Sequence, residues 1–110
     1  MASAAIYRNC AIATADKVVQ DLRTAAPQAA DDLLGVADVK ASFVIARLSG
    51  DEIALNCRSL GAINVQLIAE TLGGGGHQTM AGAQFRDVSI DDVLTRLKEA
   101  IDKYYESLNS

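Results

Sequence analysis

Four consecutive glycines followed by the sole histidine form the segment of this sequence with the clearest capacity for chemistry. Gly73, Gly74, Gly75 and Gly76 directly precede His77. Glycines let a backbone approach a ligand closely, so that its N–H groups can reach an anion or a flat base. The imidazole can then donate a hydrogen bond to a phosphate. The run is typical of either a tight structural turn or a ligand-binding loop, and four glycines are more than a turn requires.

The glycine run differs from the familiar nucleotide-binding loops. It lacks the Lys-Ser/Thr pair of a Walker A loop, and strand-like sequence follows it where a dinucleotide-binding fingerprint would begin a helix. A predicted helix ends at the glycines, so its partly negative end points toward the loop. A bound phosphate therefore needs positive groups, and Arg58 and His77 are the candidates. Ser59 follows Arg58 in RSLGAIN, a stretch rich in hydrogen-bond donors.

His77 lacks the neighbours of a metal or catalytic site. A lone histidine is more often structural than functional, but four preceding glycines leave little side-chain bulk to bury this one. One histidine without a nearby acid, cysteine or second histidine gives neither a metal site nor a nucleophile-base pair. The acidic pairs Asp31-Asp32 and Asp91-Asp92 fit the start or exposed face of a helix. We therefore predict no catalytic residue and no metal ligand.

Strand and helix patterns surround the loop. Apolar and β-branched residues at 41–48 and 52–58 flank the turn sequence Ser49-Gly50-Asp51, which predicts a β-hairpin. Asn64 is the predicted N-cap of a short helix that ends at Gly73. The other predicted elements are strands at 6–13 and 80–85, a helix at 27–34 with Pro27 at its first position, and a long helix capped by Ser89 that reaches Leu108, while 16–24 fits either helix or loop.

This order of elements predicts an α/β fold, a single compact domain with a mixed β-sheet of about four to five strands packed by helices. The 110 residues are 50% apolar, enough to bury a core. A net charge of −4 argues against sequence-independent attraction to nucleic acid or to an anionic membrane. Cys10 and Cys57 lack CxxC spacing, which favours buried, reduced thiols over a disulfide or a zinc site.

The segment NCRSLGAINVQLIAETLGGGGHQTMAGAQF, residues 56–85, resembles the DHH-associated (DHHA) domain of the DHH/DHHA phosphoesterases. Together with the sequence ahead of it, it looks most like the C-terminal part of bacterial GdpP-type cyclic-di-AMP phosphodiesterases. The resemblance implies a substrate-binding lobe over 1–110, with a strand and connector at 1–26 and a core at 27–108. It implies substrate-binding roles for Arg58, Ser59, Gly73, Gly74, Gly75, Gly76 and His77, with Ala81 and Gly82 as the small pair behind the loop.

The resemblance also implies a catalytic lobe that this chain lacks. In the family, an N-terminal DHH lobe carries two manganese ions, and the associated lobe recognises the nucleotide and closes the cleft. No DHH triplet occurs in this sequence. The chain alone is therefore expected to hold no cofactor and to be inactive, with the DHH lobe of the same polypeptide as its partner.

The expected ligand is cyclic-di-AMP or a related short dinucleotide or oligonucleotide. The alternative is a general nucleic-acid-binding module, as in single-strand exonuclease relatives, and a homodimer formed through an apolar helix stays open. The resemblance further implies a bacterial parent anchored in the membrane, with this lobe at the cytoplasmic face and without membrane contact of its own.

Overall fold

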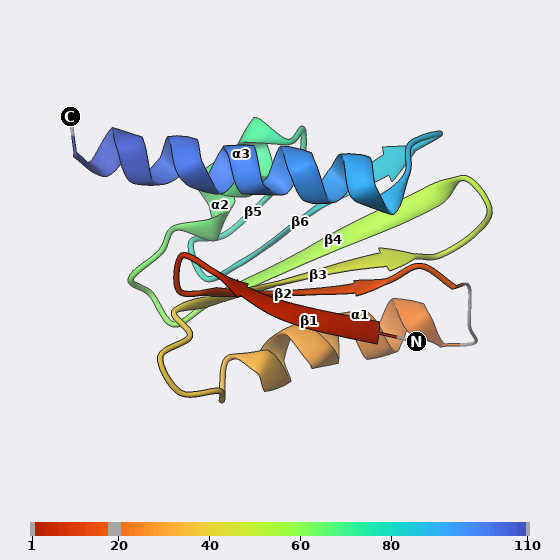
Figure 1. Cartoon of the computed structure of the whole chain (residues 1–110), viewed down its shortest axis with the longest axis horizontal. Coiled ribbons are helices and arrows are strands. Elements are labelled where there is room, and N and C mark those ends of the chain that lie inside the picture. Colours follow the sequence, from red (N-terminus) through yellow and green to blue (C-terminus); the bar gives the residue numbers. More distant parts are fainter. Residues whose placement is uncertain (1, 18–20, 110) are drawn as a thin grey trace.

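Six strands form a mixed sheet within residues 2–17 and 21–109, the part of the chain that the computed structural model describes (Figure 1). Their order is β1-β2-β3-β4-β6-β5, with β2 and β3 parallel and all other neighbours antiparallel. The strands are β1 (Ala2–Tyr7), β2 (Cys10–Ala15), β3 (Ala41–Arg47), β4 (Glu52–Ser59), β5 (Gly75–Gly76) and β6 (Met80–Arg86).

Helices cover both faces of this sheet (Figure 1). α2 (Val65–Thr71) and α3 (Ile90–Leu108) pack on one face, over the larger of two hydrophobic cores, and α1 (Leu22–Leu33) packs on the other over a small cluster rich in alanine. The predicted α/β class and mixed sheet are thus confirmed. The described sheet has six strands rather than four to five, because the N-terminal segment forms two strands and two of the glycines form β5.

The hairpin of β3 and β4 lies at the centre of the sheet and was predicted from its sequence. Ile53, Leu55 and Cys57 of β4 are fully or almost fully buried in the larger core. The side chains between them are only partly buried, and by strand alternation they face the side of the sheet that carries α1. This second face presents Asn56 and Arg58 together, two residues apart on one strand.

The N-terminal segment corrects the prediction of one strand at 6–13. β1 and β2 form an antiparallel hairpin in which Tyr7 is paired with Cys10. Arg8 and Asn9 turn the chain with φ values of 52° and 68°. Two-residue hairpin turns favour positive φ at both central positions, where asparagine is common and arginine is not. The sequence prediction was wrong here because the turn contains no glycine.

α1 begins at Leu22, so the predicted helix at 27–34 was wrong at its start. Asp21 is the N-cap, and its carbonyl accepts hydrogen bonds from the N–H groups of Thr24 and Ala25 at 3.0 and 2.9 Å. Pro27 lies inside the helix, where its missing N–H removes one hydrogen bond, and not at the first position as predicted. Of the ambiguous stretch 16–24, the last three residues are helical, and 18–20 lie outside the described residues. The predicted boundary between the connector at 1–26 and the core at 27–108 lies within this helix.

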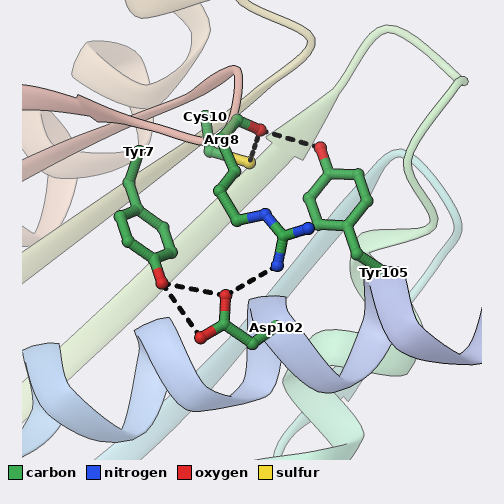
Figure 2. Close-up of polar contacts among 5 residues, drawn as sticks. All are labelled: Tyr7, Arg8, Cys10, Asp102 and Tyr105. Atoms are coloured by element: carbon green, nitrogen blue, oxygen red, sulfur yellow. Dashed lines mark hydrogen bonds and ion pairs between the residues drawn. The ribbon is translucent and has the colours of Figure 1, made fainter.

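A polar cluster fastens the turn between β1 and β2 to α3 (Figure 2). Arg8 donates from Nη1 to Oδ1 of Asp102 at 2.9 Å, and its guanidinium lies 4.5 Å from the ring centre of Tyr105. The Tyr105 hydroxyl donates to the Arg8 carbonyl oxygen at 2.8 Å. The hydrogen bond from Arg8 holds the pKa of the Asp102 carboxyl below its ordinary value. These contacts join residues from the two ends of the described chain.

None of the helices in the described part of the chain combines the length and the apolar character that crossing a bilayer requires.

Candidate functional site

The glycine run is ordered as a helix cap followed by a short strand. The Asn64 side chain accepts a hydrogen bond from the N–H of Gln66 at 3.0 Å, which confirms it as the N-cap of α2. Gly73 has a φ of 87°, and the N–H groups of Gly73 and Gly74 donate to carbonyls of the last helical turn at 3.1 and 2.8 Å. This is the left-handed helix ending that glycine favours, so the predicted stop at Gly73 is confirmed.

Two further glycines of the run are required by close packing against β6. A Cβ on Gly74 would lie 2.0 Å from the Gly82 carbonyl oxygen, and one on Gly76 would lie 2.5 Å from the Met80 carbonyl oxygen. Gly76 also has a φ of 144°. Gly75 differs, because a Cβ there would meet nothing within 4 Å. Turn and packing requirements therefore explain Gly73, Gly74 and Gly76, but they leave Gly75 unexplained.

Gly73, Gly74 and Gly75 form one wall of an open hollow of about 510 Å³. Its size is within the range of ligand pockets, about 300–1,000 Å³. Neighbouring residues of β4 and β6 complete it, and we call the whole the glycine hollow: Ala54, Leu55, Asn56, Gly73, Gly74, Gly75, Gly82, Ala83 and Gln84.

Two side-chain amides, those of Asn56 and Gln84, line the glycine hollow. Strand pairing places them side by side, since Asn56 is opposite Gly82 and Ala54 is opposite Gln84. Asn56 is partly buried and Gln84 is exposed, and neither side chain hydrogen-bonds another described residue. Both amides are thus free to pair with a ligand.

Arg58 is anchored at the end of β4 on the same face as Asn56. Its Nε donates to Oδ1 of Asp31 in α1 at 2.9 Å, and its Nη1 donates to the Cys57 carbonyl oxygen at 2.9 Å. The Arg58 side chain is 11% exposed, whereas that of Asp31 is 60% exposed. Arg58 does not line the glycine hollow, which ends two residues before it on this strand.

Two hydrogen bonds join the end of β4 and the turn after it to the turn that contains His77. The Ser59 N–H donates to the Thr79 carbonyl oxygen at 3.0 Å, and Nε2 of Gln78 donates to the Gly61 carbonyl oxygen at 3.3 Å. His77 is exposed at the turn between β5 and β6. The Ser59 hydroxyl is buried and accepts a hydrogen bond from the Gly61 N–H at 2.9 Å, so it orders the turn after β4.

The structure therefore gathers the predicted binding residues at one end of the sheet but not in one cavity. Three of the glycines line the hollow. Arg58 and Ser59 at the end of β4, Gly76 in β5 and His77 in the turn between β5 and β6 lie outside it. Sequence reasoning assigned no role to Asn56 or Gln84. The alternation of apolar and polar residues in 52–58 is a sequence signal that puts Asn56 on the same strand face as Arg58. Gln84 has no such signal, because its position beside Asn56 depends on the pairing of β4 with β6.

The described residues do not fit a dinuclear metal centre. They contain no group of three or more His, Cys, Asp or Glu side chains that could hold a metal ion. What the gathered residues offer is two amides, an imidazole and a guanidinium, which are suited to binding and orienting a phosphorylated ligand.

Comparison with known proteins shows to which protein family the chain belongs. The DHHA1 domain pattern matches residues 14–107. The chain therefore belongs to the DHHA1 domain family, which confirms the assignment made from its sequence. A crystal structure of an exopolyphosphatase-related protein from Bacteroides fragilis has the same fold, with a TM-score of 0.75 at 21% identity over 97% of this chain and 33% of that chain.

Two curated relatives are cyclic-di-AMP phosphodiesterases. GdpP of Bacillus subtilis is 49% identical over 79 residues, which are 72% of this chain and 12% of that protein. PdeA of Listeria monocytogenes is 45% identical over 96 residues, which are 87% of this chain and 15% of that protein. The chain thus spans only a small part of the length of these relatives.

Proposed function

We propose that this chain is the nucleotide-recognition lobe of a phosphodiesterase that acts on cyclic-di-AMP or a related short dinucleotide. The observation that carries the proposal is the ordered glycine wall of an open hollow next to an anchored arginine, in a chain similar to two cyclic-di-AMP phosphodiesterases. Gly75, which neither turn nor packing explains, supports a ligand that approaches the backbone closely.

Each group in the proposed site has its own task. The backbone beside Gly75 and the His77 imidazole donate to phosphate oxygens, and Arg58 adds a fixed positive charge. The Asn56 and Gln84 amides bind the edge of a base, since such amides can pair with N6 and N7 of adenine. The contribution of this lobe to catalysis is positioning of the scissile phosphodiester.

The reacting centre lies outside this chain in the proposal. A DHH lobe of the same polypeptide would hold two manganese ions that supply an activated water when bound. The parent would be anchored in a bacterial membrane, with the present lobe at the cytoplasmic face. Attraction of the substrate would be local, because the net charge of −4 gives no long-range steering of an anion.

Titration of the 110-residue chain with cyclic-di-AMP, followed by heteronuclear NMR, tests the binding proposal. We expect saturable shifts at residues 73–77 and at the Asn56 amide, and no linear dinucleotide after incubation with manganese. Rapid turnover by this chain alone would overturn the division of labour. Tighter and strongly salt-dependent binding of short RNA or DNA would instead identify a general nucleic-acid-binding module.

Substitutions in a full-length parent test the assigned roles. Arg58→Ala and His77→Ala should each lower kcat/KM by at least about tenfold, the loss typical of one charge-assisted contact. Arg96→Ala is the matched control, since it removes an exposed arginine of α3, which packs on the opposite face of the sheet from Arg58. Unchanged kcat/KM in His77→Ala would refute the role of the imidazole.

A further inference from the structure

The Arg58 guanidinium is held at two of its three nitrogens. Nε is bonded to the Asp31 carboxylate and Nη1 to the Cys57 carbonyl oxygen, both at 2.9 Å. Nη2 has no hydrogen-bond partner among the described residues. The Arg58 side chain is 11% exposed, and no side-chain nitrogen in the described chain is both fully buried and unpaired, so Nη2 is not completely buried.

This arrangement leaves one edge of the guanidinium available. A guanidinium has five N–H donors in a planar fork, of which Asp31 and the Cys57 carbonyl use one each. The three remaining N–H donors are on Nη1 and Nη2, which form the outer edge of the guanidinium. Such an edge matches two oxygens of one phosphate, a geometry that a rotating side chain would present only part of the time.

The carboxylate that fixes Arg58 is itself on a rigid support. Asp31 lies in the last turn of α1, next to Ala30, which is fully buried. The buried Ser42 hydroxyl of β3 donates to the Ala30 carbonyl oxygen and ties this turn to the sheet. A carboxylate near a helix C-terminus is disfavoured by the dipole, and the ion pair with Arg58 offsets that cost.

We propose that Asp31 is a positioning residue, which orients Arg58 so that its outer edge faces the phosphate of a dinucleotide. The inference rests on the proposed function, because it assumes that Arg58 binds phosphate. It assigns to α1, on the opposite face of the sheet from α2 and α3, a part in ligand binding.

The positioning role and simple electrostatics predict opposite effects on ligand affinity when Asp31 is removed. A carboxylate beside an anion site lowers the local positive potential, so its removal should improve affinity if charge alone mattered. If Asp31 orients Arg58, its removal should weaken binding, because the ligand must then order a mobile side chain.

The decisive experiment measures cyclic-di-AMP binding by this chain in four variants. Asp31→Ala should raise Kd about three- to tenfold, the range expected when one long side chain must be ordered on binding. Asp31→Asn, which keeps an acceptor for Nε, should fall between wild type and Asp31→Ala. Asp32→Ala removes the same charge from the next position, where the exposed side chain makes no hydrogen bond or ion pair with a described residue, and should leave Kd unchanged or slightly lower. Arg58→Ala gives the reference for complete loss of the contact.

The NMR signal of the Arg58 Nε–H group supplies a second readout. In wild type it should be shifted and protected from exchange by the Asp31 hydrogen bond, and in Asp31→Ala it should lose both properties. Unchanged or tighter binding in Asp31→Ala, with weakened binding in Arg58→Ala, would overturn the positioning role and leave the proposed function standing. No binding by wild type would overturn both. If Asp31→Ala fails to fold, the comparison of Asp31→Asn with Asp32→Ala decides.

Discussion

The Tyr7 hydroxyl donates one bifurcated hydrogen bond to the two carboxylate oxygens of Asp102, at 2.8 and 2.9 Å, although the two residues are 95 positions apart (Figure 2). Arg8 adds an ion pair to the same carboxylate at 2.9 Å. Hydrogen bonds from Arg8 and Tyr7 lower the pKa of Asp102, and the bond to Asp102 raises the pKa of Tyr7. The docking of the β1–β2 hairpin on α3 therefore depends on an ionised Asp102.

Stability should consequently fall in acid through this cluster. A carboxyl whose folded pKa lies below its unfolded value stabilises the protein above the unfolded pKa, and the contribution is lost as the pH falls through the folded pKa. The difference in unfolding free energy between wild type and Asp102→Asn should thus be positive at neutral pH and shrink below the ordinary carboxyl value of 3.8. Urea unfolding over this pH range measures it.

Glu99→Gln is the control for this pH experiment, because Glu99 is exposed on the same helix and its side chain makes no hydrogen bond or ion pair with a described residue. Tyr7→Phe should reproduce part of the loss at neutral pH. A constant difference between wild type and Asp102→Asn at every pH would show that the carboxylate charge does not hold the hairpin.

Two neighbouring glycines should respond very differently to alanine. Gly74→Ala places a methyl group 2.0 Å from the Gly82 carbonyl oxygen and should cost about 1–3 kcal/mol or more of stability. Gly75→Ala meets open space and should change stability by less than about 0.5 kcal/mol. Thermal unfolding of both variants measures the contrast.

The same pair also separates structure from binding. Because Gly75 lines the glycine hollow, Gly75→Ala should weaken cyclic-di-AMP binding even though the fold is preserved. Equal destabilisation by the two alanines would contradict the packing analysis. Full stability combined with wild-type affinity in Gly75→Ala would show that the backbone at this position does not approach the ligand.

Local chemistry made the elements next to the site predictable. The central hairpin, the Asn64 N-cap and the Gly73 stop each depend on residues within one turn or strand, and the structure confirms all three. The turn at Arg8 and Asn9 could not be recognised, because arginine is not a typical turn residue and no glycine accompanies Asn9. The start of α1 was predicted wrongly at Pro27, because proline is common at the first position of a helix. In the structure this proline lies inside the helix, which is held by the packing of Ala26 and Ala30 in the smaller core.

The candidate site was predictable in its residue types but not in its contacts. The glycines, Arg58 and His77 could be named because their chemistry is visible in the sequence. The pairing of Arg58 with Asp31 and the place of Gln84 in the hollow depend on how distant segments pack. The contact of Ser59 was also not predictable from its residue type, because its hydroxyl accepts a hydrogen bond from the Gly61 N–H in the turn after β4.

Both cysteines should be unreactive in the folded protein. Burial raises the pKa of the Cys57 thiol to about 12 and that of Cys10 to about 11, and both are free. Since the thiolate is the nucleophile, alkylation by iodoacetamide at mildly alkaline pH should be at least about tenfold slower than in urea-unfolded protein. Mass spectrometry of timed samples measures the rates. Rapid labelling of either thiol without unfolding would contradict the burial.

Asn56 offers the sharpest test of the glycine hollow. Its side chain is partly buried and makes no hydrogen bond to a described residue, so Asn56→Ala should change stability by less than about 0.5 kcal/mol. If the amide binds an adenine edge, the same variant should raise the Kd for cyclic-di-AMP about fivefold or more. It should affect cyclic-di-GMP less, because guanine presents different donors and acceptors. Calorimetric titration with both dinucleotides measures this difference.

Gln28→Ala is the matched control for Asn56→Ala, since Gln28 carries an exposed amide on α1 that makes no hydrogen bond to a described residue. Its affinity for cyclic-di-AMP should equal that of wild type. An equal loss for both dinucleotides in Asn56→Ala would mean that the amide contacts phosphate or ribose, because these groups are common to the two ligands. No loss for either would place the bound base outside the hollow, and Arg58 and His77 would then have to hold the ligand without the Asn56 amide.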